Sequence, residues 1–203
     1  MLLYNSIGPN PRVVRMFMAE RGIEIPRQEV DLRGGENRRE PYTTKVPFGQ
    51  LPALELDNGM VLSEITAICE YLDETHPGAS LIGKTPEERA ETRMWTRRFD
   101  LNIVEPAANG FRFSEGLKLF ENRIHCIPQA ADDLKKTAQL WLTRLDRMIE
   151  GRQWICGPRF TLADIFLFCF LDFANGVGQR LNPENRNVMA WFERVKARPS
   201  TAA

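Results

Sequence analysis

The chain has 203 residues, enough for one or two domains with a sizeable core, and its 27 Lys and Arg residues balance its 27 Asp and Glu residues. The zero net charge gives no long-range attraction to nucleic acid or to an anionic membrane, so neither is expected as a partner. No apolar run approaches the roughly 20 residues that cross a bilayer, and the first residues lack the basic and then apolar pattern of a signal peptide. We therefore expect a soluble, cytoplasmic protein.

The first part of the chain predicts a βαβ unit. A short apolar strand at residues 2–4 leads into the turn Gly8-Pro9-Asn10-Pro11. Pro11 suits the first position of a helix, because its missing N–H would have no partner there, and Gly22 ends this helix. Residues 28–32 have the alternating character of a second strand. A right-handed crossover would make the two strands parallel.

After a polar stretch at residues 33–45, the sequence predicts a hairpin and a helix. Residues 53–56 form a strand, Asn58-Gly59 favours a tight turn, and residues 60–62 return antiparallel. A helix begins at Ser63 or Glu64 and ends at His76-Pro77-Gly78. One face of this helix carries the apolar side chains of Ile65, Ile68, Tyr71 and Leu72. The element order over residues 1–80 is therefore βαβ followed by ββα.

The character of the chain changes after a linker near residues 78–84, and no further strand is expected. Thr85-Pro86-Glu87-Glu88 is a capping box that opens a long helix reaching about residues 106–110. Two more helices are expected, at about residues 129–150 and 188–198. Thr161 and Asp164 form another cap, which opens a helix over residues 165–174. That helix is apolar on nearly all sides and is therefore expected at the centre of the core.

The four cysteines predict neither a metal site nor a dithiol, because none lies in a C-x-x-C pair or has His at ligand spacing. Cys69 and Cys169 lie in apolar helical patterns and are expected to be buried free thiols. His76 and His125 lie near prolines, outside any catalytic motif.

Two features of the first part of the chain favour binding of a small thiol peptide. Leu51-Pro52 stands just before a strand, where a cis bond would turn the N–H and C=O of Leu51 outward to pair with an extended peptide. Glu64 begins a helix, whose free N–H groups attract a carboxylate while the Glu64 side chain holds an ammonium group. Alone, each feature has an ordinary explanation, as a strand-edge proline and as an acid favoured by the helix dipole. Together they favour a site for an amino-acid head beside Leu51.

Three segments together resemble the cytosolic glutathione transferases. They are Pro47-x-Gly49-Gln50-Leu51-Pro52, Glu64-x-x-Ala67-Ile68-x-x-Tyr71-Leu72 and Phe160-Thr161-Leu162-Ala163-Asp164-Ile165. The resemblance covers essentially the whole chain and implies an α/β plus all-α protein. Residues 1–80 would be a thioredoxin-like glutathione-binding domain, and residues 85–203 an all-helical domain that forms the second-substrate pocket. The resemblance also implies a homodimer.

The resemblance implies roles for the residues that match the glutathione-binding motif. Leu51, flanked by Gln50 and Pro52, would bind the cysteinyl backbone of glutathione, while Glu64 and Ile65 would hold its γ-glutamyl head. Ile65 departs from the family, which usually has Ser there. The lost hydroxyl hydrogen bond to a charged group costs about 1.5–3 kcal/mol unless Ser63 or Thr66 replaces it. A further departure is Val46, where Asn is common in the family.

Other parts of the site are implied with open alternatives. Asn37 and Arg38 fall where some members bind the glycine carboxylate, and Lys45 is a rival for that role. Solvated surface charges explain Arg38 and Lys45 equally well. The pocket for the second substrate would lie between the domains, and its candidate walls are Ile7, Phe99, Ile103, Phe111 and Phe113. Packing in a hydrophobic core explains these apolar side chains equally well.

The loop at residues 6–12 is expected to stabilise the glutathione thiolate, because the protonated thiol is a poor nucleophile. This loop resembles that of a bacterial and fungal subgroup with Thr-Pro-Asn, whose Thr falls on Gly8 and whose Asn falls on Asn10. Asn10 is the first choice as the catalytic residue, Ser6 the second and Tyr4 the third, and an ordinary turn residue is the alternative for Asn10. The loop has no Cys, which argues against a mixed disulfide with glutathione.

The predicted function is that of a glutathione S-transferase, with glutathione as co-substrate and no metal. It would transfer the thiolate to small hydrophobic electrophiles, as in detoxification, or reduce a peroxide or disulfide with a second glutathione. The alternative is a non-catalytic glutathione-binding or scaffold protein of the same fold, which Ile65 and Gly8 favour because both positions lack a hydroxyl. A specialised glutathione-dependent isomerase or lyase is a third reading.

Overall fold

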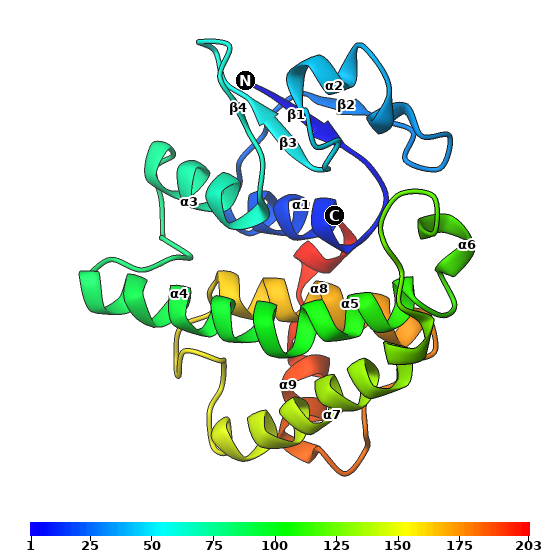
Figure 1. The fold of residues 1–203 in the computed structure, drawn as a ribbon. Helices are drawn as coiled ribbons and strands as arrows, with labels where there is room; N and C mark the ends of the chain where they lie inside the picture. The colour runs from blue at the N-terminus through cyan, green and yellow to red at the C-terminus, as the bar shows by residue number, and fades with distance from the viewer. The chain divides into compact units, whose positions relative to one another are not determined.

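The computed structural model describes residues 1–203, and its contacts divide the chain into two compact units (Figure 1). The first contains Met1–Ile82 and the C-terminal Pro199–Ala203, and the second contains Gly83–Arg198. The C-terminal residues belong with the first unit because they pack on its first helix. There the Thr201 carbonyl accepts from Arg12 at 3.1 Å, and the Ser200 hydroxyl donates to Glu20. No helix of either unit is long and apolar enough to cross a membrane.

The first unit is built on a four-stranded mixed sheet with the strand order β2-β1-β3-β4. Its strands are β1 (Leu2–Asn5), β2 (Arg27–Glu29), β3 (Ala53–Glu55) and β4 (Val61–Leu62). β1 and β2 are parallel, whereas β3 is antiparallel to both β1 and β4. Helices α1 (Pro9–Arg21) and α3 (Ile65–Thr75) pack together on one face, and α2 (Tyr42–Lys45) lies over the other (Figure 1). The predicted thioredoxin-like βαβ-ββα order is confirmed.

Two boundaries in the βαβ unit differ from the prediction. α1 begins at Pro9 rather than Pro11, directly after Gly8, whose φ of 108° suits the turn; it ends as predicted at the left-handed Gly22. β2 ends at Glu29, although residues 28–32 were expected as the strand. Val30 still donates its N–H to the Asn5 carbonyl at 2.9 Å, and the chain then turns where the Asp31 carboxylate accepts the N–H of Gly34 at 2.8 Å.

The polar stretch at residues 33–45 contains two short helical elements that its sequence pattern did not indicate. They are a 3₁₀ turn at Glu36–Arg38 and helix α2. The hairpin is confirmed, since the Leu56 N–H donates to the Met60 carbonyl at 2.8 Å. The helix expected to begin at Ser63 or Glu64 begins at Ile65 and ends before His76.

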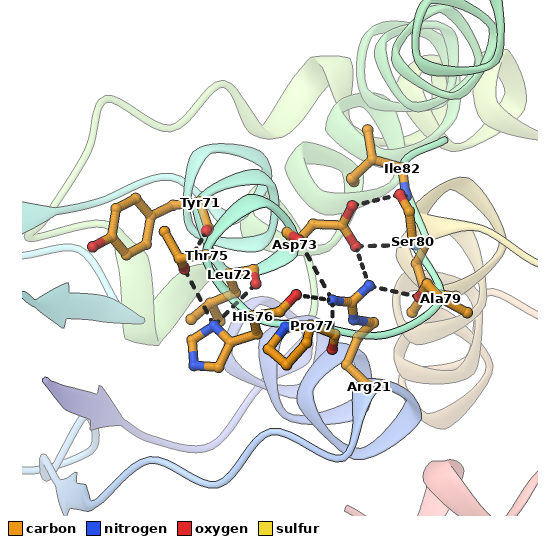
Figure 2. A network of polar contacts seen from close by, with 11 residues as sticks. Arg21, Tyr71, Leu72, Asp73, Thr75, His76, Pro77, Ala79, Ser80 and Ile82 are labelled. Atoms are coloured by element: carbon orange, nitrogen blue, oxygen red, sulfur yellow. Dashed lines mark hydrogen bonds and ion pairs between the residues drawn. The ribbon is translucent and has the colours of Figure 1, made fainter. Parts of the chain in front are cut away.

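Arg21 joins the ends of α1 and α3 (Figure 2). Its guanidinium donates to the Asp73 carboxylate at 2.9 Å and to the His76 carbonyl at 2.8 Å. The same carboxylate accepts the Ser80 hydroxyl at 2.5 Å and the Leu81 N–H at 3.0 Å. Both charged side chains are nearly buried, at 2% and 7% exposure. This network fastens the segment that follows α3 to the first unit.

The second unit is entirely helical apart from two isolated β-bridges in the loop before α8. Its helices are α4 (Pro86–Phe99), α5 (Glu105–Arg112), α6 (Leu117–Phe120), α7 (Ala131–Met148), α8 (Leu162–Gly176) and α9 (Arg186–Lys196). A π-helical turn at Asp100–Val104 joins α4 to α5, so the long helix predicted here continues without a break in direction (Figure 1). The one-turn α6 was not predicted.

Both predicted caps of the helical unit are confirmed. The Thr85 hydroxyl accepts the Glu88 N–H at 3.2 Å before α4, and Thr161 and Asp164 form a reciprocal capping box at α8. α8 packs against α4, α5 and α9 and buries residues on nearly all sides, as expected of a central helix. Cys69 and Cys169 form no disulfide, and both are fully buried.

Candidate functional site

The topology of the sheet brings four candidate segments to one edge of the first unit. In the ladders, Tyr4 pairs with Ala53 and Leu54 pairs with Leu62, while β2 runs parallel to β1. The residues that follow β1, β2 and β4 therefore lie at the same end of the sheet as the residues that precede β3. These segments comprise residues 6–10, 30–38, 63–65 and 49–52.

Leu51 presents unpaired backbone groups at this edge. The Leu51-Pro52 bond is cis, as predicted, and the N–H and C=O of Leu51 form no hydrogen bond within the chain. Pro52 is buried and Leu51 is half-buried, whereas the Gln50 side chain is exposed. An extended peptide laid against Leu51 would therefore find a free donor and a free acceptor on the same residue.

Glu64 directly precedes α3 with a φ of 73°, the only positive φ among the non-glycine residues. Such a conformation costs energy and is retained where the surrounding structure requires it, often at ligand sites. The carboxylate is exposed, and the first turn of α3 contains no acid. The N–H groups of Ile65 and Thr66, which open α3, therefore have no carboxylate of the first turn as a partner. No feature of the sequence indicated the unusual backbone at Glu64.

The three residues proposed for the glycine carboxylate have different environments. The Arg38 side chain is exposed and forms no hydrogen bond or ion pair with the chain, so its guanidinium is available. Asn37 is buried, and its Nδ2 donates to the Gly49 carbonyl at 2.6 Å. Asn37 is therefore part of the protein interior rather than a surface ligand.

Lys45 is engaged in an ion pair on the sheet. Its ammonium group lies 2.6 Å from the Glu55 carboxylate and donates to the Tyr4 hydroxyl at 2.7 Å. The hydrogen bond to Glu55 raises the pKa of Lys45, and Lys45 in turn lowers the pKa of Glu55. Arg38 is thus the better candidate for a carboxylate ligand, because its charge has no competing partner.

The candidates for contact with the sulfur also differ in what their side chains already bind. The Ser6 side chain is buried and its hydroxyl donates to the Val30 carbonyl at 2.7 Å, which commits its proton to the fold. The Tyr4 side chain is buried, burial raises the pKa of its hydroxyl, and that hydroxyl donates to Glu55 at 2.5 Å. Asn10 lies half-buried in the first turn of α1, and its amide has no hydrogen bond within the chain.

The predicted residues of the second-substrate pocket lie in both units. Ile7 belongs to the first unit and is 51% exposed. Phe99 and Ile103 belong to the second unit and are almost completely buried, with the Phe99 ring 5.5 Å from that of Trp95. The Phe111 ring packs edge-on against Phe173 and Phe120. Phe113 is also buried. Their role in a pocket stays a prediction.

Tyr42 is a residue of the site that the sequence reasoning did not single out. It is buried in α2, and its hydroxyl donates to the Gln50 carbonyl at 2.6 Å, one residue before Leu51. Burial raises the pKa of Tyr42, so this hydroxyl keeps its proton. An aromatic residue in an otherwise polar stretch was the only available signal. No group of three or more His, Cys, Asp and Glu side chains is arranged to hold a metal ion.

The fold and this sheet edge define a thioredoxin-like domain with exposed peptide-pairing groups, followed in the chain by an all-helical domain. Residues 7–75 match the model for the N-terminal domain of glutathione S-transferases, and residues 120–199 match the model for their C-terminal domain. The chain belongs to the glutathione S-transferase family.

Similar proteins span almost the whole chain. Glutathione S-transferase 2 of Saccharomyces cerevisiae is 30% identical over 98% of this chain and 87% of its own length. FtsZ-localized protein A of Caulobacter vibrioides is 27% identical over 95% of this chain and 85% of its own. The crystal structure of a glutathione S-transferase domain-containing protein from Marinobacter aquaeolei is 33% identical, with a TM-score of 0.92, and covers 99% of this chain and 100% of its own.

Proposed function

We propose that this protein is an active glutathione transferase, which activates the thiol of glutathione and transfers it to small hydrophobic electrophiles. The observation that carries the proposal is the set of unpaired groups at one sheet edge: the Leu51 backbone, the Glu64 carboxylate and the Asn10 amide. Glutathione offers a complementary partner for each, namely its cysteinyl backbone, its γ-glutamyl ammonium group and its sulfur.

Each end of glutathione would meet a group of opposite charge. Glu64 holds the γ-glutamyl ammonium group, while the N–H of Ile65 and the dipole of α3 hold the γ-glutamyl carboxylate. Arg38 holds the glycine carboxylate, because its guanidinium is exposed and unpaired. Ile65 supplies no hydroxyl, so the γ-glutamyl carboxylate depends on backbone donors or on the nearby Ser63 and Thr66.

Activation of the thiol requires that its anion be stabilised. Asn10 donates from its amide to the sulfur, and the N-terminus of α1, which has no acid in its first turn, adds positive potential. The thiol proton passes to solvent, and the thiolate then forms a bond to carbon of the electrophile while the leaving group departs with its electron pair. A homodimer and a cytoplasmic location are part of the same proposal.

The test replaces Asn10 with Ala and measures conjugation of glutathione to a chloro-nitrobenzene. Removal of a hydrogen bond to a charged sulfur should raise the pKa of the bound thiol and lower turnover at neutral pH by about 10- to 100-fold. Thiolate absorbance as a function of pH gives that pKa directly. If Ser6→Ala instead raises the thiol pKa and Asn10→Ala does not, the sulfur ligand is Ser6. Absence of conjugation and peroxide reduction by the unaltered protein would contradict an enzymatic role.

A glutathione-binding protein without catalysis is a second candidate. It is favoured by the engagement of the Ser6 and Tyr4 hydroxyls elsewhere, which leaves the loop without a free hydroxyl for the sulfur. Calorimetric titration with glutathione separates the two functions: binding with no change in thiol pKa and no turnover identifies the non-catalytic protein. If the titration shows no binding of glutathione, it contradicts both the active transferase and the non-catalytic binding protein.

A further inference from the structure

The segment before Leu51 is fastened to the preceding helical turns by two buried side chains. Asn37, in the 3₁₀ turn, donates from Nδ2 to the Gly49 carbonyl at 2.6 Å, and Tyr42, in α2, donates from its hydroxyl to the Gln50 carbonyl at 2.6 Å. Two consecutive carbonyls thus point into the protein. Both donor residues are almost completely buried, at 2% and 5% exposure; the Asn37 hydrogen bond is buried, and the Tyr42 hydrogen bond is partly buried.

Fixing these carbonyls also fixes the N–H groups that follow them. In a planar trans peptide, the carbonyl of one residue and the N–H of the next point in opposite directions. The Gln50–Leu51 bond is trans, because only the bonds preceding Pro41 and Pro52 are cis. When Tyr42 holds the Gln50 carbonyl inward, it therefore turns the Leu51 N–H outward, toward the place where a peptide backbone would pair with it.

Tyr42 is itself held by its surroundings. Its ring packs edge-on against Tyr4 at 5.7 Å between ring centroids, and the Tyr4 hydroxyl lies between Glu55 and Lys45. The Tyr42 hydroxyl is therefore a donor at a defined position rather than a group that rotates freely.

Gly49 allows the close approach that Asn37 requires. A Cβ atom at Gly49 would lie 2.5 Å from the Asn37 carbonyl oxygen, and the φ of 63° at Gly49 also favours glycine. Gly49 donates its own N–H to the Val46 carbonyl at 2.8 Å, which completes a tight turn. The segment is thus held at three successive points just before the residue that presents free backbone groups.

We propose that Asn37 and Tyr42 are positioning residues for glutathione that touch no ligand atom. Tyr42 sets the direction of the Leu51 N–H that pairs with the cysteinyl backbone, and Asn37 fixes the preceding peptide group between Gly49 and Gln50. The inference rests on the proposed glutathione site. It gives Asn37 a role different from contact with the glycine carboxylate. It also gives a function to Lys45 and Glu55, because both hydrogen-bond to Tyr4, whose ring packs against Tyr42.

The test compares Tyr42→Phe with Tyr71→Phe, a matched control on α3 whose hydroxyl forms no hydrogen bond within the chain. Loss of one neutral hydrogen bond should raise the dissociation constant and the KM for glutathione about three- to tenfold in Tyr42→Phe and leave Tyr71→Phe unchanged. The kcat at saturating glutathione and the KM for the electrophile should not change, because the reacting atoms are not displaced once glutathione is bound. Amide hydrogen exchange should be faster at residues 48–51 and unchanged in β1.

The outcomes separate this inference from the function on which it rests. Absence of glutathione binding by the unaltered protein overturns both. Binding by the unaltered protein, with equal affinity in Tyr42→Phe, overturns the positioning role alone, and so does a fall in kcat without a change in KM. Should Tyr42→Phe fail to fold, Asn37→Ala gives readouts in the same direction, since it releases the Gly49 carbonyl and with it the peptide group that precedes the Gln50–Leu51 peptide.

Discussion

Arg38 has an unpaired charge at the sheet edge where glutathione is proposed to bind. Arg38→Ala should weaken glutathione binding about five- to tenfold, because an exposed ion pair with the glycine carboxylate is partly screened by solvent. The measurement is calorimetric titration with glutathione and with γ-glutamylcysteine, which lacks the glycine. The substitution should leave affinity for the dipeptide unchanged.

The control for the Arg38 substitution is Arg147→Ala, which removes the same charge from the exposed face of α7 in the other unit. It should change neither affinity. Equal weakening of both ligands by Arg38→Ala would mean that Arg38 acts through the fold of its loop. If Arg38→Ala weakened the binding of neither ligand, none of the three candidates would remain to bind the glycine carboxylate.

Individual residues also show which property of a site local sequence patterns do not predict, namely whether a polar side chain has a partner in the folded chain. Leu51, Pro52 and Glu64 were selected from short local patterns, and the Leu51 backbone groups and the Glu64 carboxylate have no hydrogen-bond partner in the chain. Lys45 and Ser6 were selected by the same kind of pattern. Their partners, Glu55 and Val30, lie 10 and 24 positions away in the sequence. Whether a polar side chain is free depends on such partners, and no local pattern identifies them.

At the scale of elements, the start of α8 depends on one buried carboxylate. Asp164 accepts the N–H groups of Ile155 at 2.9 Å and Thr161 at 3.0 Å, and the indole N–H of Trp191 at 2.8 Å. The carboxylate thereby joins α8 to α9 and to the preceding loop. Burial raises the pKa of Asp164 to about 6, although these donors act in the opposite direction.

This pKa predicts how the contribution of Asp164 varies with pH. The folded pKa of about 6 lies above the unfolded value of about 3.9, so the stabilisation is fully present below pH 4 and is lost as the pH rises through 6. The free energy of unfolding of the unaltered protein should therefore exceed that of Asp164→Asn most at pH 4, and the difference should shrink by about 2–3 kcal/mol toward pH 7.5.

Urea unfolding of both proteins across this pH range measures the difference. Comparison with Asp164→Asn cancels the opposite effect of half-buried acids such as Glu55 and Glu88, whose pKa values are lowered in the folded protein. A difference that grows with pH would mean that the three N–H donors outweigh burial and hold the carboxylate ionised.

The sequence predicted which helices and strands form better than it predicted where each of them begins and ends. Caps and breakers such as Gly22, Asn58-Gly59 and Thr161 act through adjacent residues, and the structure confirms all of them. α2 and the 3₁₀ turn before it were missed because a short polar segment has no periodic pattern. They form where Tyr42 and Asn37 are buried against residues that follow later in the chain.

At the scale of the whole molecule, binding of glutathione should stabilise the folded protein. At a glutathione concentration 100 times its dissociation constant, the stabilisation is about 2.7 kcal/mol, which raises the midpoint of thermal unfolding by about 5 to 10 °C in a chain of this size. The measurement is calorimetric unfolding with and without the ligand.

A matched control for the thermal shift is cysteinylglycine, which keeps the thiol but lacks the γ-glutamyl head assigned to Glu64. Its effect should be several-fold smaller at the same concentration. If the two units unfold in separate transitions, the shift should belong to the transition of Met1–Ile82 with Pro199–Ala203. An equal shift by both ligands would contradict the role of Glu64.

The sequence by itself determined the order of elements, the change from α/β to all-α, and the Leu51-Pro52 and Glu64 features that identify the family, because these depend on neighbours in the chain. Only the tertiary structure decided which polar groups remain free at the sheet edge, that Tyr42 and Asn37 hold the segment before Leu51, and that Pro199–Ala203 packs with the first unit. The reason is physical: burial and hydrogen-bond partners are set by residues that are distant in sequence and meet only in the folded chain.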